Sequence, residues 1–402
     1  MAGTLFSTRV ESISTPPSMA ANARAAELIR QGRDIINLTV GEPDLDTPKH
    51  VIDAAHEALN AGDTHYTPPN GTLALRQAIA CKLARDNDLH YSTDEIVVGG
   101  GAKTVIYHAF AATLNRGEQV LVHSPYWVSY PDMAKLNEGE PVILAGEERY
   151  GFKLQASQLA ASINEKTKWV VLNTPNNPSG AVYAEDELAA LAEVLRQHPH
   201  VLILSDEIYE KFVFSGSRHL SILNVAPDLK DRTLLVNGVS KGYAMTGWRV
   251  GYAAGPKALI SAMVKMLAQT STCTSSISQT AAIAALSGDQ GPVEDIRATY
   301  EVRQQLVTRL FAEIKDMPLQ TPQGAFYAYP NVAALIGRTT PDGKTLHTDL
   351  EVATFFLDYA DVAVVPGAAY GLSPYVRLSF ATSPQLIEQA IKRMGRAVAL
   401  LK

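Results

Sequence analysis

The residues most suited to covalent chemistry lie in the stretch NGVSKGYAMTGWRVGYAAG, residues 237–255. It holds Lys241 and, eight positions later, Arg249, both among small residues and between two apolar runs typical of buried strands. Most lysines and arginines are solvated surface charges. The alternative is that the amine of Lys241 bonds a carbonyl covalently and the guanidinium of Arg249 holds a phosphate. The rest of the sequence decides between these two interpretations.

Further candidate residues follow the other predicted strands, and in open α/β sheets ligands bind at the carboxyl ends of strands. After the first strand, GGGAK at residues 99–103 opens a helix, where glycines free backbone N–H groups to bind an anion. After the second, Trp127 offers a flat face to a ring, although a buried core tryptophan is the commoner case. After the third, NTPNNPSG supplies the amide groups of Asn176 and Asn177.

A fourth strand end carries Asp206, Glu207 and Tyr209 in the segment SDEIY. A carboxylate at the end of a buried strand is unfavourable unless a cation meets it. A phosphate cradle, a stacking face, an acid, a phenol, a lysine and an arginine together suit pyridoxal phosphate: the lysine bonds its aldehyde, and the carboxylate pairs with its protonated ring nitrogen. A dinucleotide or a nucleoside triphosphate fits less well, because the glycine motifs that bind them are absent.

The elements that must position these residues alternate along the chain from Asp94 to Gly255. Apolar runs predict strands within 94–100, 118–125, 168–175, 200–207, 232–238 and 248–255. Amphipathic stretches between them, at 103–114 and 184–198, predict helices. This alternation predicts an α/β fold with a largely parallel sheet buried on both faces.

We expect two domains, because 402 residues exceed the usual size of a single core. Residues 48–290 should form the large domain. A long helical segment at 293–314 and the short apolar runs after it predict a smaller α+β domain, formed by residues 1–47 and 291–402. The first 45 or so residues are too few for a core and should pack onto this second domain or onto a partner.

The bulk composition is that of an ordinary globular protein, with 46% hydrophobic and 19% charged residues. A net charge of −6 argues against a nucleic-acid-binding surface. Cys81 and Cys273 lack metal-ligand spacing, so we expect neither a metal site nor a disulfide framework. No apolar run is long enough for a signal peptide or a membrane span, which predicts a cytoplasmic protein with no membrane partner.

The segment GVSKGYAMTGWRVG resembles the lysine signature of the class I pyridoxal-phosphate-dependent aminotransferases. The segments GEPDLDTP, YTPPNG, SPYWVSYP, NTPNNPSG, SDEIYE, QGAFYAYP and VRLSFATS fall in that family's order and spacing, from about residue 9 to 400. The chain is most similar to the bacterial aspartate aminotransferases. The resemblance implies fold type I, with a seven-stranded-type, largely parallel sheet in a large cofactor domain and a smaller α+β domain. It also implies a homodimer with shared active sites.

The same resemblance implies roles for the matching residues. Lys241, Asp206 and Tyr209 look like the catalytic residues, with Asp206 the partner of the ring nitrogen and Tyr209 beside the ring hydroxyl. The implied cofactor-binding residues are Gly101, Ala102, Lys103, Trp127, Asn177, Asp206, Tyr209, Ser240, Lys241, Arg249 and, reaching from the neighbouring subunit, Tyr66. The implied substrate-binding residues are Gly41, Trp127, Asn177, Arg377, Lys103 and Ser18, of which Arg377 clamps the α-carboxylate.

The implied activity is ping-pong transfer of an amino group from an L-amino acid, foremost aspartate, to a 2-oxo acid, foremost 2-oxoglutarate. The region QTSTCTSSISQ lacks an arginine for a second carboxylate, and Lys103 with Ser18 matches the residues that take this role in the bacterial branch. Aromatic amino acids or prephenate therefore stay open as substrates, as does a pyridoxal-phosphate Cβ-lyase activity. A regulator built on this fold would need a DNA-binding module in front, and the first 45 residues show no basic helix-turn-helix pattern.

Overall fold

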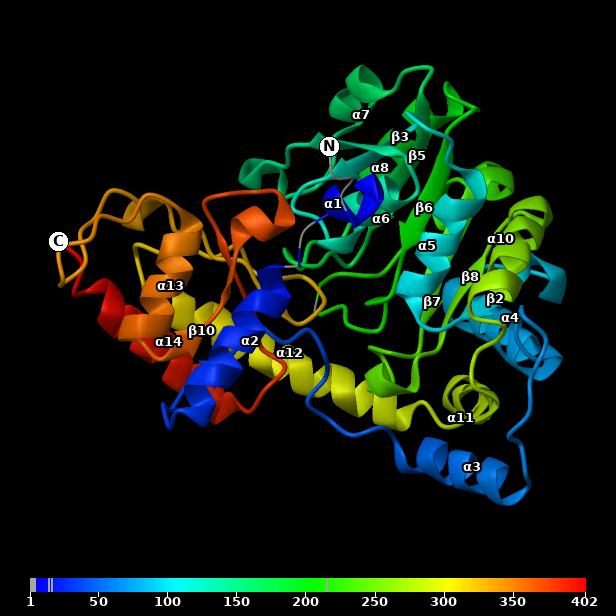
Figure 1. The fold of residues 1–402 in the computed structure, drawn as a ribbon, viewed down its shortest axis with the longest axis horizontal. Coiled ribbons are helices and arrows are strands. Elements are labelled where there is room, and N and C mark those ends of the chain that lie inside the picture. The colour runs from blue at the N-terminus through cyan, green and yellow to red at the C-terminus, as the bar shows by residue number, and fades with distance from the viewer. Residues whose placement is uncertain (1–4, 14, 16, 215) are drawn as a thin grey trace.

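The computed structural model describes residues 5–13, 15, 17–214 and 216–402, and only the backbone of residues 17, 18 and 20. Its largest element is a seven-stranded sheet with the order β2-β8-β7-β6-β5-β3-β4 (Figure 1). The strands are β2 (Ile96–Gly99), β3 (Gln119–His123), β4 (Glu140–Leu144), β5 (Thr167–Asn173), β6 (Leu202–Asp206), β7 (Thr233–Gly238) and β8 (Gly251–Ala254). β8 is antiparallel to β2 and β7, and the other neighbouring pairs are parallel. The predicted largely parallel sheet is therefore confirmed.

One strand of this sheet, β4, was not among the apolar runs expected to form strands. It lies at the edge of the sheet beside β3. Glu140 and Ile143 are exposed, and Pro141 lies within the strand. Proline is confined largely to edge strands, because it cannot donate to a ladder. An edge strand needs no continuous apolar run, so its sequence gives a weaker signal than that of the buried strands.

Helices cover both faces of the sheet. One face carries α5 (Ala102–Thr113), α6 (Ser129–Leu136) and α10 (Lys257–Thr270), and the other carries α4 (Leu73–Asn87), α8 (Glu185–Arg196) and α11 (Ser276–Ser287). Successive strand residues point to opposite layers: Val97 and Val171 pack in one core, Val98 and Val170 in the other. This explains why the strands are apolar on both faces.

A separate hydrophobic core, which marks a second region of the molecule, lies beside the sheet and its helices, around the long helix α12 (Gly291–Phe311). It includes a three-stranded antiparallel sheet in the order β11-β12-β9, formed by β9 (Tyr327–Ala328), β11 (Val365–Pro366) and β12 (Val376–Ser379). β1 (Ile36–Asn37) pairs in parallel with β10 (Val362–Ala363), so this part of the N-terminal segment lies against the C-terminal region. The domain boundaries themselves stay a prediction.

The remaining helices complete the two regions. They are α1 (Thr8–Glu11), α2 (Pro17–Arg30), α3 (Lys49–Asn60), α7 (Ala156–Ser162), α9 (Ile222–Val225), α13 (Asp349–Tyr359) and α14 (Pro384–Val398). α3 packs against α11 at the lower edge of the view in Figure 1, whereas α12, α13 and α14 lie in the other region. Of the helices in the described part of the chain, none has the length and apolar character needed to cross a membrane.

Candidate active site

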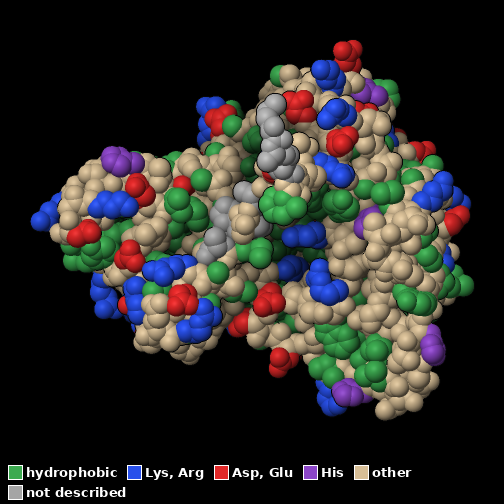
Figure 2. Space-filling model, viewed as in Figure 1, with side chains coloured by type: hydrophobic (Ala, Val, Ile, Leu, Met, Phe, Trp, Pro, Cys, Tyr) green, Lys and Arg blue, Asp and Glu red, His purple; other side chains and the backbone are tan. Residues whose placement is uncertain are grey.

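A cavity of about 260 Å³ lies at the carboxyl ends of the parallel strands. Its lining residues are Thr39, Gly41, Ala102, Lys103, Trp127, Tyr130, Asn173, Asn177, Asp206, Ile208, Tyr209, Ser240, Lys241, Thr246, Arg249, Tyr327 and Arg377. Figure 2 shows Lys and Arg side chains gathered in a hollow near the middle of one face of the molecule. The cavity brings together residues that span more than 330 positions of the sequence, including most of those singled out above.

Lys241 lies in the turn that follows β7, and its ammonium donates a 2.6 Å hydrogen bond to the carbonyl oxygen of Gly41. Burial lowers the pKa of Lys241 to about 8; Arg249 and Arg377 act in the same direction, whereas Glu42 opposes them. A lysine with this pKa exists partly as a free amine near neutral pH. It can therefore serve as a nucleophile or as a base.

Asp206 is the last residue of β6, and it is buried and lines the cavity. The hydroxyl of Tyr130 donates to Oδ2 at 2.6 Å, and the backbone N–H of Ile208 donates to Oδ1 at 3.2 Å. Burial raises the pKa of Asp206 to about 6, although both hydrogen bonds lower it. Within the described residues Asp206 takes part in no ion pair, so a cationic group in the cavity would be strongly stabilised.

Arg249 lies against the N-terminus of α5, with Nη2 donating to the carbonyl oxygen of Gly100 at 3.1 Å. A Cβ at Gly101 would lie 2.4 Å from this Nη2, and Gly101 has φ +99°. Only glycine therefore allows the guanidinium to lie over the helix N-terminus. Lys103 adds a second cation, whose pKa is lowered by burial and by Arg249. Two cations at a helix N-terminus form a site for an anion such as phosphate.

Arg377 approaches the cavity from β12 and is almost fully buried. Its Nη2 donates to the carbonyl oxygen of Thr39 at 2.5 Å, and its Nη1 donates to Asn177 Oδ1 at 3.4 Å. The guanidinium also lies 4.6 Å from the ring centre of Tyr327. Its Nε is buried and has no hydrogen-bond partner among the described residues. An arginine without a paired acid suits a carboxylate ligand, which can accept two parallel hydrogen bonds.

Tyr209 and Trp127 supply the aromatic part of the site. The hydroxyls of Tyr209 and Tyr327 lie 2.8 Å apart, and both side chains are buried. Trp127 is half-buried and packs edge-on against Tyr130, with ring centres 5.2 Å apart. The ammonium of Lys103 lies 4.9 Å from the centre of a Trp127 ring. A flat ligand in the cavity would thus meet a ring face, two phenols and a cation.

Some predicted residues lie outside the cavity. Tyr66 is 88% exposed and does not line it. Glu207 is turned away from the cavity toward His219, and the amide of Asn176 donates to the carbonyl oxygen of Pro125. Ser18 belongs to α2, but its side chain lies outside the described residues.

Other lining residues were missed from the sequence. Tyr130 follows Trp127 by three positions, and Asn173 is the last residue of β5, so their places at a helix start and a strand end could have indicated them. Asn173 accepts a hydrogen bond from the backbone N–H of Asn177 at 3.0 Å. Tyr327 and Thr39 come from the second region, and no local pattern in the sequence connects them to the cavity.

Comparison with known proteins gives matches over almost the whole chain. Residues 33–394 match the model of a family described as aminotransferase class I and II. The chain is 44% identical over 396 residues to an aspartate aminotransferase of Rhizobium meliloti (strain 1021), covering 98% of this chain and 97% of that relative. It is 45% identical over 379 residues to a probable aspartate/prephenate aminotransferase of Rhizobium leguminosarum bv. phaseoli, covering 94% and 95%.

Solved structures agree with these matches. The crystal structure of the Rhizobium meliloti aspartate aminotransferase superposes with a TM-score of 0.97 at 44% identity, covering 100% of both chains. The aspartate aminotransferase of Thermus thermophilus with maleate gives a TM-score of 0.91 at 38% identity, covering 99% of this chain and 100% of that one. The predicted fold class is confirmed by this likeness over the full length.

Proposed function

The chain belongs to the aminotransferase class I and II family, and we propose that it transfers an amino group from aspartate to 2-oxoglutarate with pyridoxal phosphate as cofactor. The names of relatives that are 44% identical support aspartate as the donor. One observation carries the proposal. The amine of Lys241, the buried carboxylate of Asp206 and the guanidinium of Arg249 at a helix N-terminus all line one cavity.

The donor set fits pyridoxal phosphate at each of its polar groups. Arg249 and the N–H groups at the start of α5, given room by Gly101, suit the phosphate. Asp206, which has no cationic partner among the described residues, suits a protonated ring nitrogen. Tyr209 and Asn177 are the groups proposed to bind the ring hydroxyl. When bound, the cofactor supplies an aldehyde that takes the amino group and a ring that withdraws electrons from the substrate Cα.

Lys241 is proposed to move the proton at the substrate Cα. Its pKa of about 8 leaves a useful fraction of free amine near neutral pH. The hydrogen bond to the carbonyl oxygen of Gly41, which also lines the cavity, holds its Nζ within the cavity. In one half of the cycle Nζ removes the Cα proton of the amino acid, and in the other half it returns a proton to the Cα of the incoming oxo acid.

Substrate binding is proposed to rest on two cations with separate tasks. Arg377, whose Nε has no partner among the described residues, holds the α-carboxylate of every substrate. Lys103 holds the second carboxylate of aspartate, aided by Ser18. A flexible ammonium is less selective than a guanidinium, so prephenate is a second candidate substrate. A relative named aspartate/prephenate aminotransferase at 45% identity supports that candidate.

A homodimer with shared active sites is proposed from the surface around Tyr66. Tyr66 is 88% exposed, and Leu59 and Leu73 nearby in the chain are 49% and 53% exposed. A second copy that covers this surface would bring Tyr66 to the partner's cofactor phosphate. The division into residues 48–290 and residues 1–47 with 291–402 is proposed in the same way. The cytoplasmic location stays a prediction.

The full chain, loaded with pyridoxal phosphate, provides the test. Addition of aspartate alone should change the absorbance of the bound cofactor, and 2-oxoglutarate should restore it. Borohydride should attach the cofactor to Lys241, and Lys241→Ala should abolish transfer while the fold is retained. A cofactor attached to another lysine would overturn the assignment. Release of pyruvate and ammonia without any oxo acid would instead indicate the Cβ-lyase activity.

A further inference from the structure

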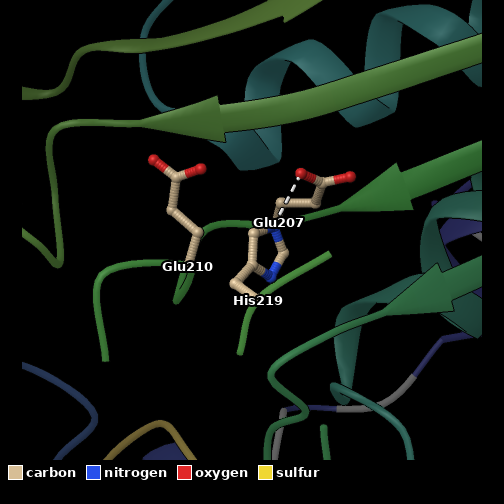
Figure 3. A group of neighbouring side chains, drawn as sticks. All are labelled: Glu207, Glu210 and His219. Atoms are coloured by element: carbon tan, nitrogen blue, oxygen red, sulfur yellow. Dashed lines mark hydrogen bonds and ion pairs between the residues drawn. The ribbon is translucent and has the colours of Figure 1, made fainter. Parts of the chain in front are cut away.

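Behind the turn that follows β6, a group of buried charged side chains takes no part in the cavity. Figure 3 shows three of them, Glu207, Glu210 and His219, with the ion pair between Glu207 and His219 drawn as a dashed line. Their ligand atoms lie within 4.8 Å of one another. Lys82 of α4 joins them through an ion pair with Glu210. The side chains of Glu207 and Lys82 are only 0% and 1% exposed, so the group lies in the interior.

The turn presents some of its residues to the cavity and others to this buried group. Asp206 and Tyr209 line the cavity, whereas Glu207 and Glu210 interact with the group behind it. The turn is tight: the backbone N–H of Glu210 donates to the carbonyl oxygen of Glu207 at 2.9 Å. The backbone N–H of Glu207 donates to the carbonyl oxygen of Val236 in β7, also at 2.9 Å. Any displacement of the two glutamates must therefore displace their neighbours in the cavity.

Each glutamate is held by two donors, of which all but Ser205 come from other parts of the chain. Ser205 Oγ donates to Glu207 at 2.7 Å, and His219 Nε2 donates to it at 2.9 Å. The ammonium of Lys82 and the amide of Asn87, at 2.7 Å, hold Glu210. Burial raises the pKa of Glu210, but Lys82, His219 and Lys211 outweigh it and lower that pKa to about 2. Glu210 is therefore a buried, ionised and fully engaged carboxylate.

Two carboxylates and a histidine could also suggest a metal site. The arrangement argues against it, because a divalent cation at Glu210 would have to displace the ammonium of Lys82. The facing oxygens of Glu207 are likewise engaged with Ser205 and His219. Buried ion pairs add little net stability compared with apolar residues of the same volume, and in some proteins they fix a single geometry instead. Buried polar networks whose groups find partners make the surrounding structure rigid. In this group the buried Nδ1 of His219 is the exception, since it has no hydrogen-bond partner among the described residues.

We propose that Lys82, Glu207, Glu210 and His219 are positioning residues, which hold Asp206 and Tyr209 in place from behind the turn. The proposal rests on the roles proposed for Asp206 and Tyr209 at the cofactor. Lys82 is the anchor of this group, because it joins the turn to α4, the helix that packs on the opposite side of the sheet edge from α5. None of these four residues lines the cavity, and the group acts through the backbone of residues 206–210.

The first experiment removes the anchor charge. Lys82→Met in the full chain leaves Glu210 with an uncompensated charge, and we expect the turn to loosen. Hydrogen exchange of the amides at residues 207–212, measured without cofactor, should accelerate at least tenfold relative to α12. With cofactor, kcat should fall about 10- to 100-fold, the size expected for misplacement by about 1 Å, whereas KM should change little. The absorbance of the bound cofactor should also titrate at a different pH.

Two further proteins separate positioning from general destabilisation. Lys82→Met with Glu210→Gln replaces the ion pair by a neutral pair of similar volume, and we expect it to recover most of the lost kcat and of the slow exchange. Lys153→Met is the matched control. It breaks a 2.6 Å ion pair with Glu187 at a side chain only 14% exposed, but Lys153 does not line the cavity. We expect its kcat within twofold of the native protein.

Histidine variants keep the proposal testable if Lys82→Met does not fold. His219→Gln retains a donor for Glu207 and should keep slow exchange at residues 207–212, whereas His219→Leu removes the donor and should accelerate it. Equal exchange in these two variants, with kcat unchanged in both, would overturn the proposal. Stoichiometric Zn²⁺ or Mn²⁺ bound through Glu207 and Glu210 would also overturn it. If the native chain shows no transamination, the proposed function fails, while exchange without cofactor still reports on the turn.

Discussion

The hydroxyl of Tyr130 donates a 2.6 Å hydrogen bond to Oδ2 of Asp206, and both side chains are buried. Tyr130 belongs to α6 and Asp206 ends β6, so this bond joins a covering helix to the end of a central strand. The bond lowers the pKa of a carboxyl group that burial raises to about 6. A neutral donor thus helps to keep Asp206 ionised in an environment that disfavours the charge.

Tyr130→Phe should raise the pKa of Asp206, because the carboxylate loses a donor worth about 1.5–3 kcal/mol. Activity should fall about tenfold at the acidic end of the kcat profile and recover at higher pH, so the acidic limb of the profile moves to higher pH. Tyr183→Phe is the control, since the Tyr183 hydroxyl is also buried but accepts from the backbone N–H of Leu154, away from Asp206. A kcat profile for Tyr130→Phe that keeps its shape would contradict the role of this bond.

Asp206→Asn should stabilise the chain without cofactor at neutral pH while it removes most activity. The pKa of Asp206 is about 6 in the folded protein against an ordinary 3.8. Between about pH 4 and 6 the folded state therefore binds more protons than the unfolded state, and its free energy of unfolding falls as pH rises, by about 3 kcal/mol in total. Because asparagine cannot ionise, Asp206→Asn should not show this decrease in the free energy of unfolding.

Urea denaturation of the chain without cofactor at pH 4.5 and pH 7 measures this difference. The exposed Asp53→Asn on α3 controls for the loss of one negative charge. With cofactor bound, the native protein should be the more stable of the two, because the neutral amide of Asp206→Asn cannot stabilise a protonated ring nitrogen. If the free energies of unfolding of the native protein and of Asp206→Asn differ by the same amount at both pH values, burial does not raise the pKa of Asp206.

Gly101→Ala should weaken cofactor binding at least tenfold. Its Cβ would lie 2.4 Å from Arg249 Nη2, so the guanidinium would have to leave the N-terminus of α5. Gly117→Ala is a matched control, because Gly117 also has a positive φ, +81°, but no atom lies within 4 Å of its Cβ position. Both variants carry the backbone strain, and only Gly101→Ala should lose affinity for pyridoxal phosphate and stabilisation by inorganic phosphate. Equal affinities in the two variants would remove Gly101 from the anion site.

The exposed Tyr66 predicts complementation between two inactive proteins. A heterodimer of Lys241→Ala and Tyr66→Phe protomers has one undamaged site and one site with both lesions, if Tyr66 reaches across the interface. Activity should therefore appear on mixing, after subunit exchange, to at most half of the native value per dimer. No gain on mixing, although mass spectrometry detects heterodimers, would show that Tyr66 serves its own subunit or neither.

The sequence predicted the central sheet well, because six of its strands are continuous apolar runs buried on both faces. β4 was not predicted, because an edge strand with exposed Glu140 and Ile143 has no such run. The short strands of the second region, two to four residues each, give hardly any periodic signal. In that region the resemblance of the quoted segments to the family indicated the fold better than the periodicity of apolar residues did.

Candidate residues at strand ends were found for the same physical reason, since the carboxyl ends of parallel strands meet at one edge. Strand ends do not show which way a side chain turns, and Glu207 illustrates this limit. It follows Asp206 directly, yet it lies on the opposite side of the turn and binds His219. Tyr327 lies within the quoted segment QGAFYAYP, but its place in the site was not predicted, because only the packing of the two regions brings its hydroxyl within 2.8 Å of that of Tyr209.

Substrate choice gives the last prediction, which compares the two cations proposed for substrate. Arg377→Lys should depress kcat/KM for all amino acids, because an ammonium cannot form the bidentate pair with an α-carboxylate. Lys103→Ala should lower kcat/KM about 10- to 100-fold for aspartate and glutamate, the size of a lost charged hydrogen bond, and much less for phenylalanine or alanine.

Lys103 also lies beside Arg249, whose charge helps to lower its pKa, so it could instead serve the cofactor phosphate. That alternative predicts an equal loss for all substrates together with weaker cofactor retention. The ratio of kcat/KM for aspartate and phenylalanine in Lys103→Ala separates the two, and an unchanged ratio would remove Lys103 from substrate selection.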